Sequence, residues 1–306
     1  MHELSRVRAS LLALLVTFLW STSWVLIKWG LADIPPLTFA GLRYGIAFLI
    51  LLPAAWRRRE EVRALSRADW GRLAVLGVVF YALTQGGQFM TLTHLDAITF
   101  SLILSFTPVL VASVGSTLLR ERPSRLQWAG IALTLAGAAA YFAPSIETGW
   151  GLLGLLLAVG TLASNAGAAT LGRSVNRRRP ASPVVITTIS MGIGAACLLG
   201  IGLGTQGMPS LRLSSWGIVL WLAVVNTAIA FTIWNRTLRV LSATESSVVN
   251  NTMLIQIALL AWIFLGESLT LLEIVALLVV AAGTLLVQLR RRPQTGTLSR
   301  GVSKPS

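Results

Sequence analysis

Apolar runs of about 20 residues follow one another along almost the whole chain, each long enough for a helix to cross about 30 Å of hydrocarbon. Breaks such as Pro35-Pro36, Pro144 and Gly207–Pro209 separate them. Because a lone apolar segment must satisfy its own backbone hydrogen bonds in lipid, each run is expected to be a helix. Ten spans are predicted, at residues 10–29, 37–56, 70–90, 96–118, 124–143, 149–172, 183–204, 215–235, 244–265 and 270–289.

The second half of the chain repeats the first. Trp216-Gly217 lies 146 residues after Trp70-Gly71, and Glu267 follows Glu121 at the same spacing. Acidic residues are too few in this chain for the glutamate match to come from composition. We therefore expect two five-helix units, residues 1–145 and 146–290, and a basic tail over residues 291–306.

The positions of the basic residues predict the orientation of the spans. Of the 25 Lys and Arg residues, all but Lys28, Arg43 and Arg212 fall in the terminal segments or in loops on one side of the predicted membrane. The positive-inside rule places that side, with both termini, in the cytoplasm. Five spans is an odd number, so the second unit enters the membrane inverted. The prediction is an all-α integral membrane protein of the cell (inner) membrane, with two inverted repeats as in secondary transporters.

Composition agrees with a bilayer protein and argues against other classes. Only 12% of the residues are charged, against about 25% in a soluble protein, and the mean hydropathy is +0.75. The net charge of +14 does not indicate a nucleic-acid partner, because the arginines lie in short loops between apolar runs. Cys197 is the single cysteine, so no disulfide framework, metal cluster or cofactor is predicted. The oligomeric state stays open, with a monomer as one option.

Residues of the first half resemble a known family. They are Leu19-Trp20-Ser21-Thr22-Ser23-Trp24, Lys28, Arg43-Tyr44, Pro108, Glu121, Gly130 and Gly137. This set resembles the EamA-type repeat of the drug/metabolite transporter superfamily. The resemblance implies ten helices in two inverted halves around a central cavity lined by spans one, three, four, six, eight and nine. Two departures make the halves inequivalent, since Leu254 stands where the second half would repeat Pro108 and span seven has no counterpart of Arg43.

Polar side chains inside the spans are the candidate substrate-binding residues, because each is costly to place in lipid. Asn250 and Asn251 lie in span nine, and Ser247 shares a helix face with Asn251. At the repeat spacing of 146, Ser247 and Asn251 correspond to Ser101 and Ser105 in span four. Two polar faces are thus predicted to meet centrally and bind a polar substrate. The alternative is that they only join helices to one another.

Aromatic and amide side chains complete the predicted cavity. Trp20 and Trp24 are four residues apart on one face of span one, and aromatic walls suit the apolar part of a substrate. Contact with lipid or the core is the alternative for these indoles. The full candidate set is Trp20, Ser21, Trp24, Tyr81, Gln85, Ser101, Ser105, Asn165, Asn226, Asn250 and Asn251.

Five further residues are expected to have structural or gating roles. Lys28 lies near the end of span one, where its side chain can extend to the headgroups. Arg43 is expected to be a structural counter-charge, with an anion contact as the alternative. Pro108 belongs to span four, and Glu121 and Glu267 follow spans four and nine, where they are expected to hold loops in place.

The predicted function is a secondary transporter that moves small metabolites by alternating access, above all an amino-acid or metabolite exporter. The alternative is a multidrug-type efflux carrier for apolar cations, which would need a buried acid that the spans lack. That lack favours facilitated diffusion, or coupling through an edge residue such as Glu245 or His94. An enzyme is not favoured, because two histidines, one cysteine and edge acids form no catalytic constellation. The expected partners are a small-molecule substrate and the bilayer.

Overall fold

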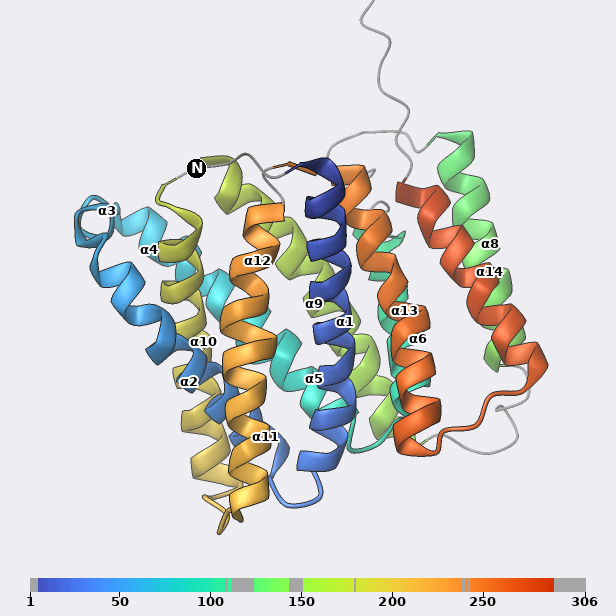
Figure 1. Cartoon of the computed structure of the whole chain (residues 1–306), viewed down its shortest axis with the longest axis horizontal. Helices are drawn as coiled ribbons and strands as arrows, with labels where there is room; N and C mark the ends of the chain where they lie inside the picture. Colours follow the sequence, from blue (N-terminus) through green and yellow to red (C-terminus); the bar gives the residue numbers. More distant parts are fainter. Residues whose placement is uncertain are drawn as a thin grey trace, which may run out of the picture.

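The computed structural model describes residues 5–107, 109–111, 124–142, 151–178, 180–237, 240–241 and 243–288, and every regular element in these ranges is a helix. The helices lie side by side as a bundle (Figure 1). Their bounds are α1 Arg6–Gly30, α2 Pro36–Trp56, α3 Arg59–Arg63, α4 Arg67–Leu76, η1 Gly77–Gln85, α5 Gly86–Thr91, α6 Ala97–Ser105, α8 Arg125–Phe142, α9 Leu152–Arg178, α10 Pro183–Thr205, α11 Leu213–Ala223, η3 Val224–Ile229, α12 Ala230–Thr237, α13 Ala243–Leu265 and α14 Leu271–Gln288.

Six helical stretches are long and apolar enough to cross a membrane. They are Val7–Gly30, Pro36–Trp56, Arg67–Thr91, Leu152–Gly172, Pro183–Thr205 and Leu213–Trp234. Thr252–Leu265 and Leu271–Leu286 are shorter apolar helices. The prediction of an all-α, multi-pass membrane protein is therefore confirmed, while the count of ten spans and the inversion of the second unit stay predictions.

Helix ends follow from local sequence. Pro36 occupies the first turn of α2, where its missing N–H is not needed. Ser66 and Asp69 form a reciprocal capping box at the start of α4. Gly266 follows α13 with a φ of 68°, a left-handed conformation that glycine adopts without strain and that commonly ends a helix. The breaks predicted from the apolar pattern thus have a stereochemical basis.

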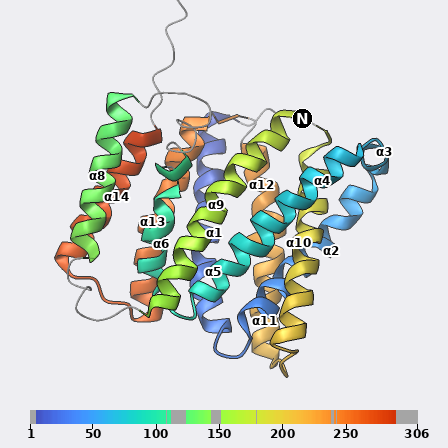
Figure 2. The same ribbon diagram turned by 180° about the vertical axis from the view of Figure 1, so that it is seen from behind.

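Helix α1 packs against α11, α12 and α13 (Figure 1), and α2 packs against α10. The view from behind shows α9 crossing the other face of the bundle, where it contacts η1, α5 and α6 (Figure 2). Helices α8 and α14 form a pair at one edge. Their backbones are so close that a Cβ added to Gly283 would lie 2.6 Å from the amide nitrogen of Thr134. Small residues permit such close approach between membrane helices.

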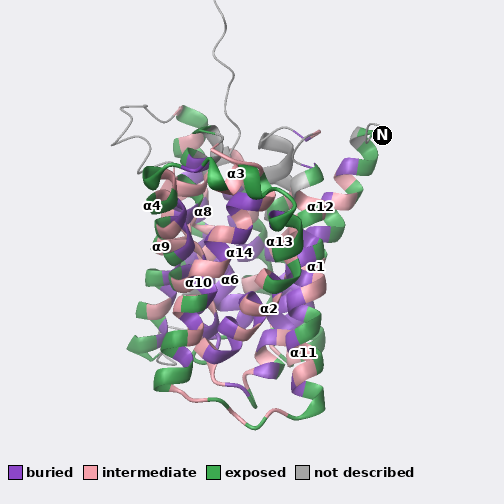
Figure 3. Cartoon of the chain, turned by 90° about the vertical axis from the view of Figure 1, so that its left-hand side faces the viewer, coloured by how far each residue is buried: buried purple, intermediate pink, exposed green. Residues whose placement is uncertain are grey.

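Burial divides the side chains into an inner and an outer set (Figure 3). Large apolar side chains such as Phe39, Phe89 and Phe100 are fully buried in one core cluster. Others, such as Leu213 and Leu271, are largely exposed on the outside, which suits a surface that faces acyl chains. The core therefore lies along the middle of the bundle, where the candidate polar residues are concentrated.

Candidate functional site

A polar cluster, buried on the α1 side and half-buried on the α13 side, joins α1 to α13 near the middle of both helices. The hydroxyl of Ser21 lies 2.8 Å from the carbonyl oxygen of Thr17 and 3.0 Å from Oε1 of Gln256. The amide nitrogen of Gln256 donates to the hydroxyls of Thr252, at 3.0 Å, and Thr17, at 3.4 Å. We call Thr17, Ser21, Thr252 and Gln256 the central cluster. It links the two predicted units near the middle of these two helices.

The sequence prediction included Ser21 but missed Thr17, Thr252 and Gln256 as site residues. A signal for them exists, because Thr17 precedes Ser21 by four residues and Thr252 precedes Gln256 by four. Residues four apart share a helix face, so two polar pairs on apolar helices predict a contact.

Among the described residues of the predicted site, Asn226 and Ser21 are the two that are fully buried. Asn226 lies at the start of η3, and its Nδ2 donates to the carbonyl oxygen of Leu19 and, at 3.1 Å, to the hydroxyl of Thr22. Its Oδ1 has no hydrogen-bond partner among the described residues. A buried amide oxygen without a partner costs about 1–3 kcal/mol. The site therefore holds an acceptor that a ligand or water would satisfy.

Trp20 supplies an unpaired donor to the same interface between α1 and the η3–α12 segment. Its indole Nε1 is buried without a partner in the described part of the chain. The ring centroid lies 5.3 Å from that of Phe231 and 5.1 Å from that of Trp234, both on α12. Trp24 contacts a different ring, Phe100 of α6, at 5.3 Å, so the two indoles do not form one shared group, and their lining of a cavity stays a prediction.

Arg43 is a buried cation. Only 4% of its surface is exposed, and its Nε donates to the hydroxyl of Thr227 at 3.1 Å. Its guanidinium carbon lies 5.1 Å from the ring centroid of Tyr44. The ion pairs found among the described residues are Arg58–Glu61 and Arg72–Asp69, so Arg43 has no acidic partner there. The sequence predicted that Arg43 is a structural counter-charge. Within the described residues no carboxylate is paired with it.

Tyr44 connects α2 to η1. Its hydroxyl donates to Oε1 of Gln85 at 2.7 Å, and its ring packs edge-on against Tyr81 with centroids 5.4 Å apart. Gln85 is half-buried, and its amide nitrogen has no hydrogen-bond partner among the described residues. The two predicted residues Tyr81 and Gln85 are thus close together, with one donor group unused.

The π-helical segments η1 and η3 position several of these residues. Residues 224–229 lie 146 positions after residues 78–83, which belong to η1, so the two segments correspond at the repeat spacing. In each, a threonine hydroxyl donates to a carbonyl five residues earlier, Thr84 to Val79 and Thr227 to Leu222. Short π-helical stretches inside α-helices are frequent at functional sites. Nothing in the apolar pattern predicted them.

The serines predicted in span four bond to their own helix. Ser101 donates to the carbonyl of Ile98 at 2.8 Å, and Ser105 donates to that of Leu102 at 2.6 Å. Asn165 of α9 donates to the hydroxyl of Thr107 at 3.0 Å, which ties α9 to the segment just after α6. The hydroxyl oxygens of Ser101 and Ser105 can still accept hydrogen bonds, but both hydroxyl protons are already donated to carbonyls of the same helix.

Four of the predicted residues are not part of the buried contacts described above. Asn250 is exposed. The side chain of Asn251, and Pro108 and Glu121 as whole residues, lie outside the part that the structure describes. The meeting of two symmetric polar faces therefore stays a prediction.

Glu267 closes the end of the bundle opposite the start of α1. Its two carboxylate oxygens accept the backbone N–H groups of Ala97 at 2.8 Å and Ile98 at 2.9 Å, the first residues of α6. Burial raises the pKa of the Glu267 carboxyl, although these two N–H groups and nearby Lys28 act in the opposite direction. Glu267 thus contacts a helix from the other half of the chain.

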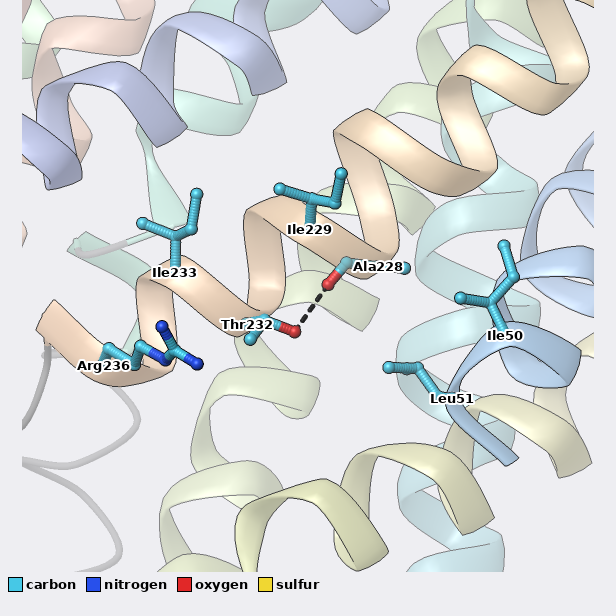
Figure 4. A pocket seen from close by; sticks show the side chains of 7 residues that line it. All are labelled: Ile50, Leu51, Ala228, Ile229, Thr232, Ile233 and Arg236. Atoms are coloured by element: carbon cyan, nitrogen blue, oxygen red, sulfur yellow. Dashed lines mark hydrogen bonds between the residues drawn. The ribbon is translucent and has the colours of Figure 1, made fainter. Parts of the chain in front are cut away.

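Two pockets lie against the second half of α2. One, of about 440 Å³, is lined by Leu52, Pro53, Trp56 and Arg57. The other, of about 350 Å³, lies between α2 and the η3–α12 segment (Figure 4) and is lined by Ile50, Leu51, Ala228, Ile229, Thr232, Ile233 and Arg236. The central cluster lines neither pocket, because its side chains are packed against one another.

Comparisons with known proteins identify relatives that are membrane transporters. The chain is 29% identical to YvbV, an uncharacterised transporter of Bacillus subtilis, over 96% of both chains. It is 28% identical to an S-adenosylmethionine/S-adenosylhomocysteine transporter of Chlamydia trachomatis, covering 85% of this chain and 83% of the relative. It is 27% identical to a probable amino-acid metabolite efflux pump of Salmonella typhimurium, covering 89% and 92%.

A solved crystal structure has a similar fold, with a TM-score of 0.61 and 18% identity over 92% of this chain and 98% of that one. The pattern of one transporter family matches the chain twice, at residues 7–143 and 152–289. The two matches confirm the resemblance seen in the sequence and cover both halves. The protein therefore belongs to the EamA-like transporter family.

Proposed function

We propose that this protein is a secondary transporter of the cell (inner) membrane that exports small metabolites by alternating access. The substrate class that we propose is amino acids and related metabolites with an α-amino-carboxylate group. Membership of a transporter family supports the general role. The substrate class is supported by two relatives, since S-adenosylmethionine, S-adenosylhomocysteine and amino-acid metabolites share amino-acid chemistry.

The observation that carries this proposal is unused hydrogen-bonding capacity in the middle of the bundle. Asn226 Oδ1 is an acceptor without a partner, Trp20 Nε1 is a donor without one, and Arg43 is a cation without an acid in the described chain. An α-amino-carboxylate offers an ammonium donor and a carboxylate acceptor, which are the complementary groups. In a low-dielectric site such complementarity gives both affinity and selectivity.

Alternating access would use contacts between the two halves. The central cluster joins α1 to α13 near the middle of both helices, and Glu267 joins the loop after α13 to the start of α6 at one end. In the proposed cycle the central contacts act as the pivot, and the Glu267 contact breaks and forms as that end opens and closes. This scheme fits a transporter built from two repeats.

The proposed topology has both termini in the cytoplasm and the second unit inverted. It is supported by the distribution of Lys and Arg and by the corresponding positions of η1 and η3. Single cysteines in a Cys197→Ser background test it with a membrane-impermeant thiol reagent. Ser210→Cys should react in intact cells, whereas Ser66→Cys should react only after permeabilisation. The reverse labelling pattern would contradict the topology.

Export of apolar cations is the second candidate, and the aromatic group formed by Trp20, Phe231 and Trp234 favours it. Aromatic faces attract cations. Proteoliposomes distinguish the two functions. Asn226→Leu keeps the side-chain size and removes the amide oxygen that has no partner, together with the bonds of Nδ2 to α1, so we expect it to lower amino-acid efflux at least tenfold. Thr205→Ala, at an exposed helix end, is the control and should leave efflux unchanged. Efflux of lipophilic cations alone would support the second candidate.

A further inference from the structure

The groove between α2 and the η3–α12 segment has the features of a site for a single lipid. Figure 4 shows Ile50 and Leu51 on one side, the residues from Ala228 to Ile233 on the other, and Arg236 at one end. We call this the α2–α12 groove. It lies toward the end of the bundle at which α1 begins, which is the predicted cytoplasmic side (Figure 1).

The wall of the groove is apolar and open to the outside of the bundle. Ile50 is 42% exposed and Ile229 is 45% exposed, while Ala228 at the far end is buried. The hydroxyl of Thr232 donates to the carbonyl of Ala228 at 2.7 Å, so its proton is already hydrogen-bonded within the helix. Such a surface suits an acyl chain better than a polar solute.

The length of the groove fits an acyl chain within one leaflet. Ala228 and Arg236 are eight residues apart, which corresponds to about 12 Å along a helix. One leaflet contributes about 15 Å of hydrocarbon. A chain whose headgroup lies beside Arg236 would therefore reach close to the midplane, where Ala228 adjoins Thr227, the hydrogen-bond partner of Arg43.

The charge at the end of the groove fits an anionic headgroup. Arg236 is exposed, lies in the last turn of α12 and forms no ion pair within the described ranges. Trp56, 68% exposed, and Arg57 lie at the corresponding end of α2. Exposed tryptophans are enriched at the membrane interface, and a guanidinium binds phosphate through two parallel hydrogen bonds. These residues place the phosphate level of the leaflet at Arg236.

We propose that the α2–α12 groove binds one anionic phospholipid of the leaflet on the N-terminal side. Arg236 holds the phosphate, and one acyl chain lies along Ile50, Leu51, Ile229 and Ile233 as far as Ala228. The lipid then packs directly against η3, the segment that positions Asn226. The proposal depends on the membrane embedding of the chain and not on the substrate that it transports.

Native mass spectrometry of the purified full chain tests this site. The protein is incubated in detergent with phosphatidylglycerol or phosphatidylcholine of identical acyl chains. We expect retention of one phosphatidylglycerol in preference to phosphatidylcholine. Arg236→Gln should weaken that retention about tenfold, the loss expected for one charge-assisted contact. Arg125→Gln is the matched control, because Arg125 is an exposed arginine at the start of α8, away from the groove.

A second variant tests the acyl-chain part of the site. Thr232→Trp fills the groove and keeps Arg236, so it should also reduce phosphatidylglycerol retention. Elution volume and melting temperature show whether each variant is folded. Equal retention of the two lipids, or an equal loss in Arg236→Gln and Arg125→Gln, would overturn the proposal in favour of general surface charge. Unchanged retention in Thr232→Trp would show that the groove is not the site.

Discussion

Replacing Glu267 by alanine should loosen one end of the bundle. Its carboxylate accepts the N–H groups of Ala97 and Ile98 at 2.8 and 2.9 Å. Asp96 occupies the N-cap position of α6 but makes no side-chain capping bond, so Glu267 replaces the local cap. Removing an N-cap acceptor typically costs about 1 kcal/mol, and Glu267→Ala leaves two N–H groups unpaired. We therefore expect the free energy of unfolding to fall by about 2 kcal/mol. For a chain of this length, that loss lowers the melting temperature by about 3 °C.

Hydrogen exchange measured by mass spectrometry locates this effect. In Glu267→Ala, amide exchange should accelerate in the first turn of α6. Glu273→Ala is the matched control, because Glu273 caps its own helix through the N–H of Thr270 at 2.7 Å. That variant should accelerate exchange at the start of α14 only. Unchanged exchange at Ala97 and Ile98 in Glu267→Ala would refute the assignment of Glu267 as the cap of α6.

The pH dependence of this contact follows from the pKa of Glu267. Burial raises that pKa in the folded state, so folding favours the protonated carboxyl. The contribution of this ionisation to stability is thus fully present below the ordinary glutamate pKa and is lost as pH rises through the folded pKa. The melting temperature of the wild type should fall over that window relative to that of Glu267→Ala. If the melting temperature of the wild type instead rose relative to that of Glu267→Ala over this pH window, the pKa of Glu267 would not be raised by folding.

Two further predictions concern the interior. Arg43→Gln removes a buried charge that has no acidic partner in the described chain. The melting temperature should therefore stay constant or rise, while efflux of carboxylate substrates should fall about tenfold. A large decrease in melting temperature would instead indicate a structural role. Gly283→Ala places a Cβ 2.6 Å from the amide nitrogen of Thr134 and should destabilise the α8–α14 pair by about 1–3 kcal/mol. Gly160→Ala meets no atom within 4 Å and should be neutral or stabilising by up to about 1 kcal/mol, and equal melting temperatures for the two variants would refute the close approach.

The sequence was sufficient for the class of fold because lipid imposes a strong constraint on composition. Runs of apolar residues bounded by proline, glycine or arginine predicted helices such as α2 and α10 within a few residues. The π-helical segments were not predictable in the same way. A shift in hydrogen bonding from four to five residues leaves no mark on an apolar pattern, and η1 and η3 consist of the same residue types as their neighbours.

The contacts of the candidate site were harder to predict because they depend on packing between distant segments. Asn226 was predicted as a site residue, but its bonds to Leu19 and Thr22 span more than 200 positions. Glu267 was expected to hold a loop, and its contact with α6, 170 residues away along the chain, needed the tertiary structure. Composition can show that a buried polar group needs a partner, but not which partner it finds.

The measurement that tests the central claim most directly is efflux from proteoliposomes loaded with labelled amino acids and related metabolites. The account predicts efflux of compounds with an α-amino-carboxylate group, its loss in Asn226→Leu, and an unchanged rate in Thr205→Ala. No efflux of any such compound, beside an active control transporter in matched vesicles, would contradict the proposed substrate class. Equal efflux from wild type and Asn226→Leu would contradict the proposed site.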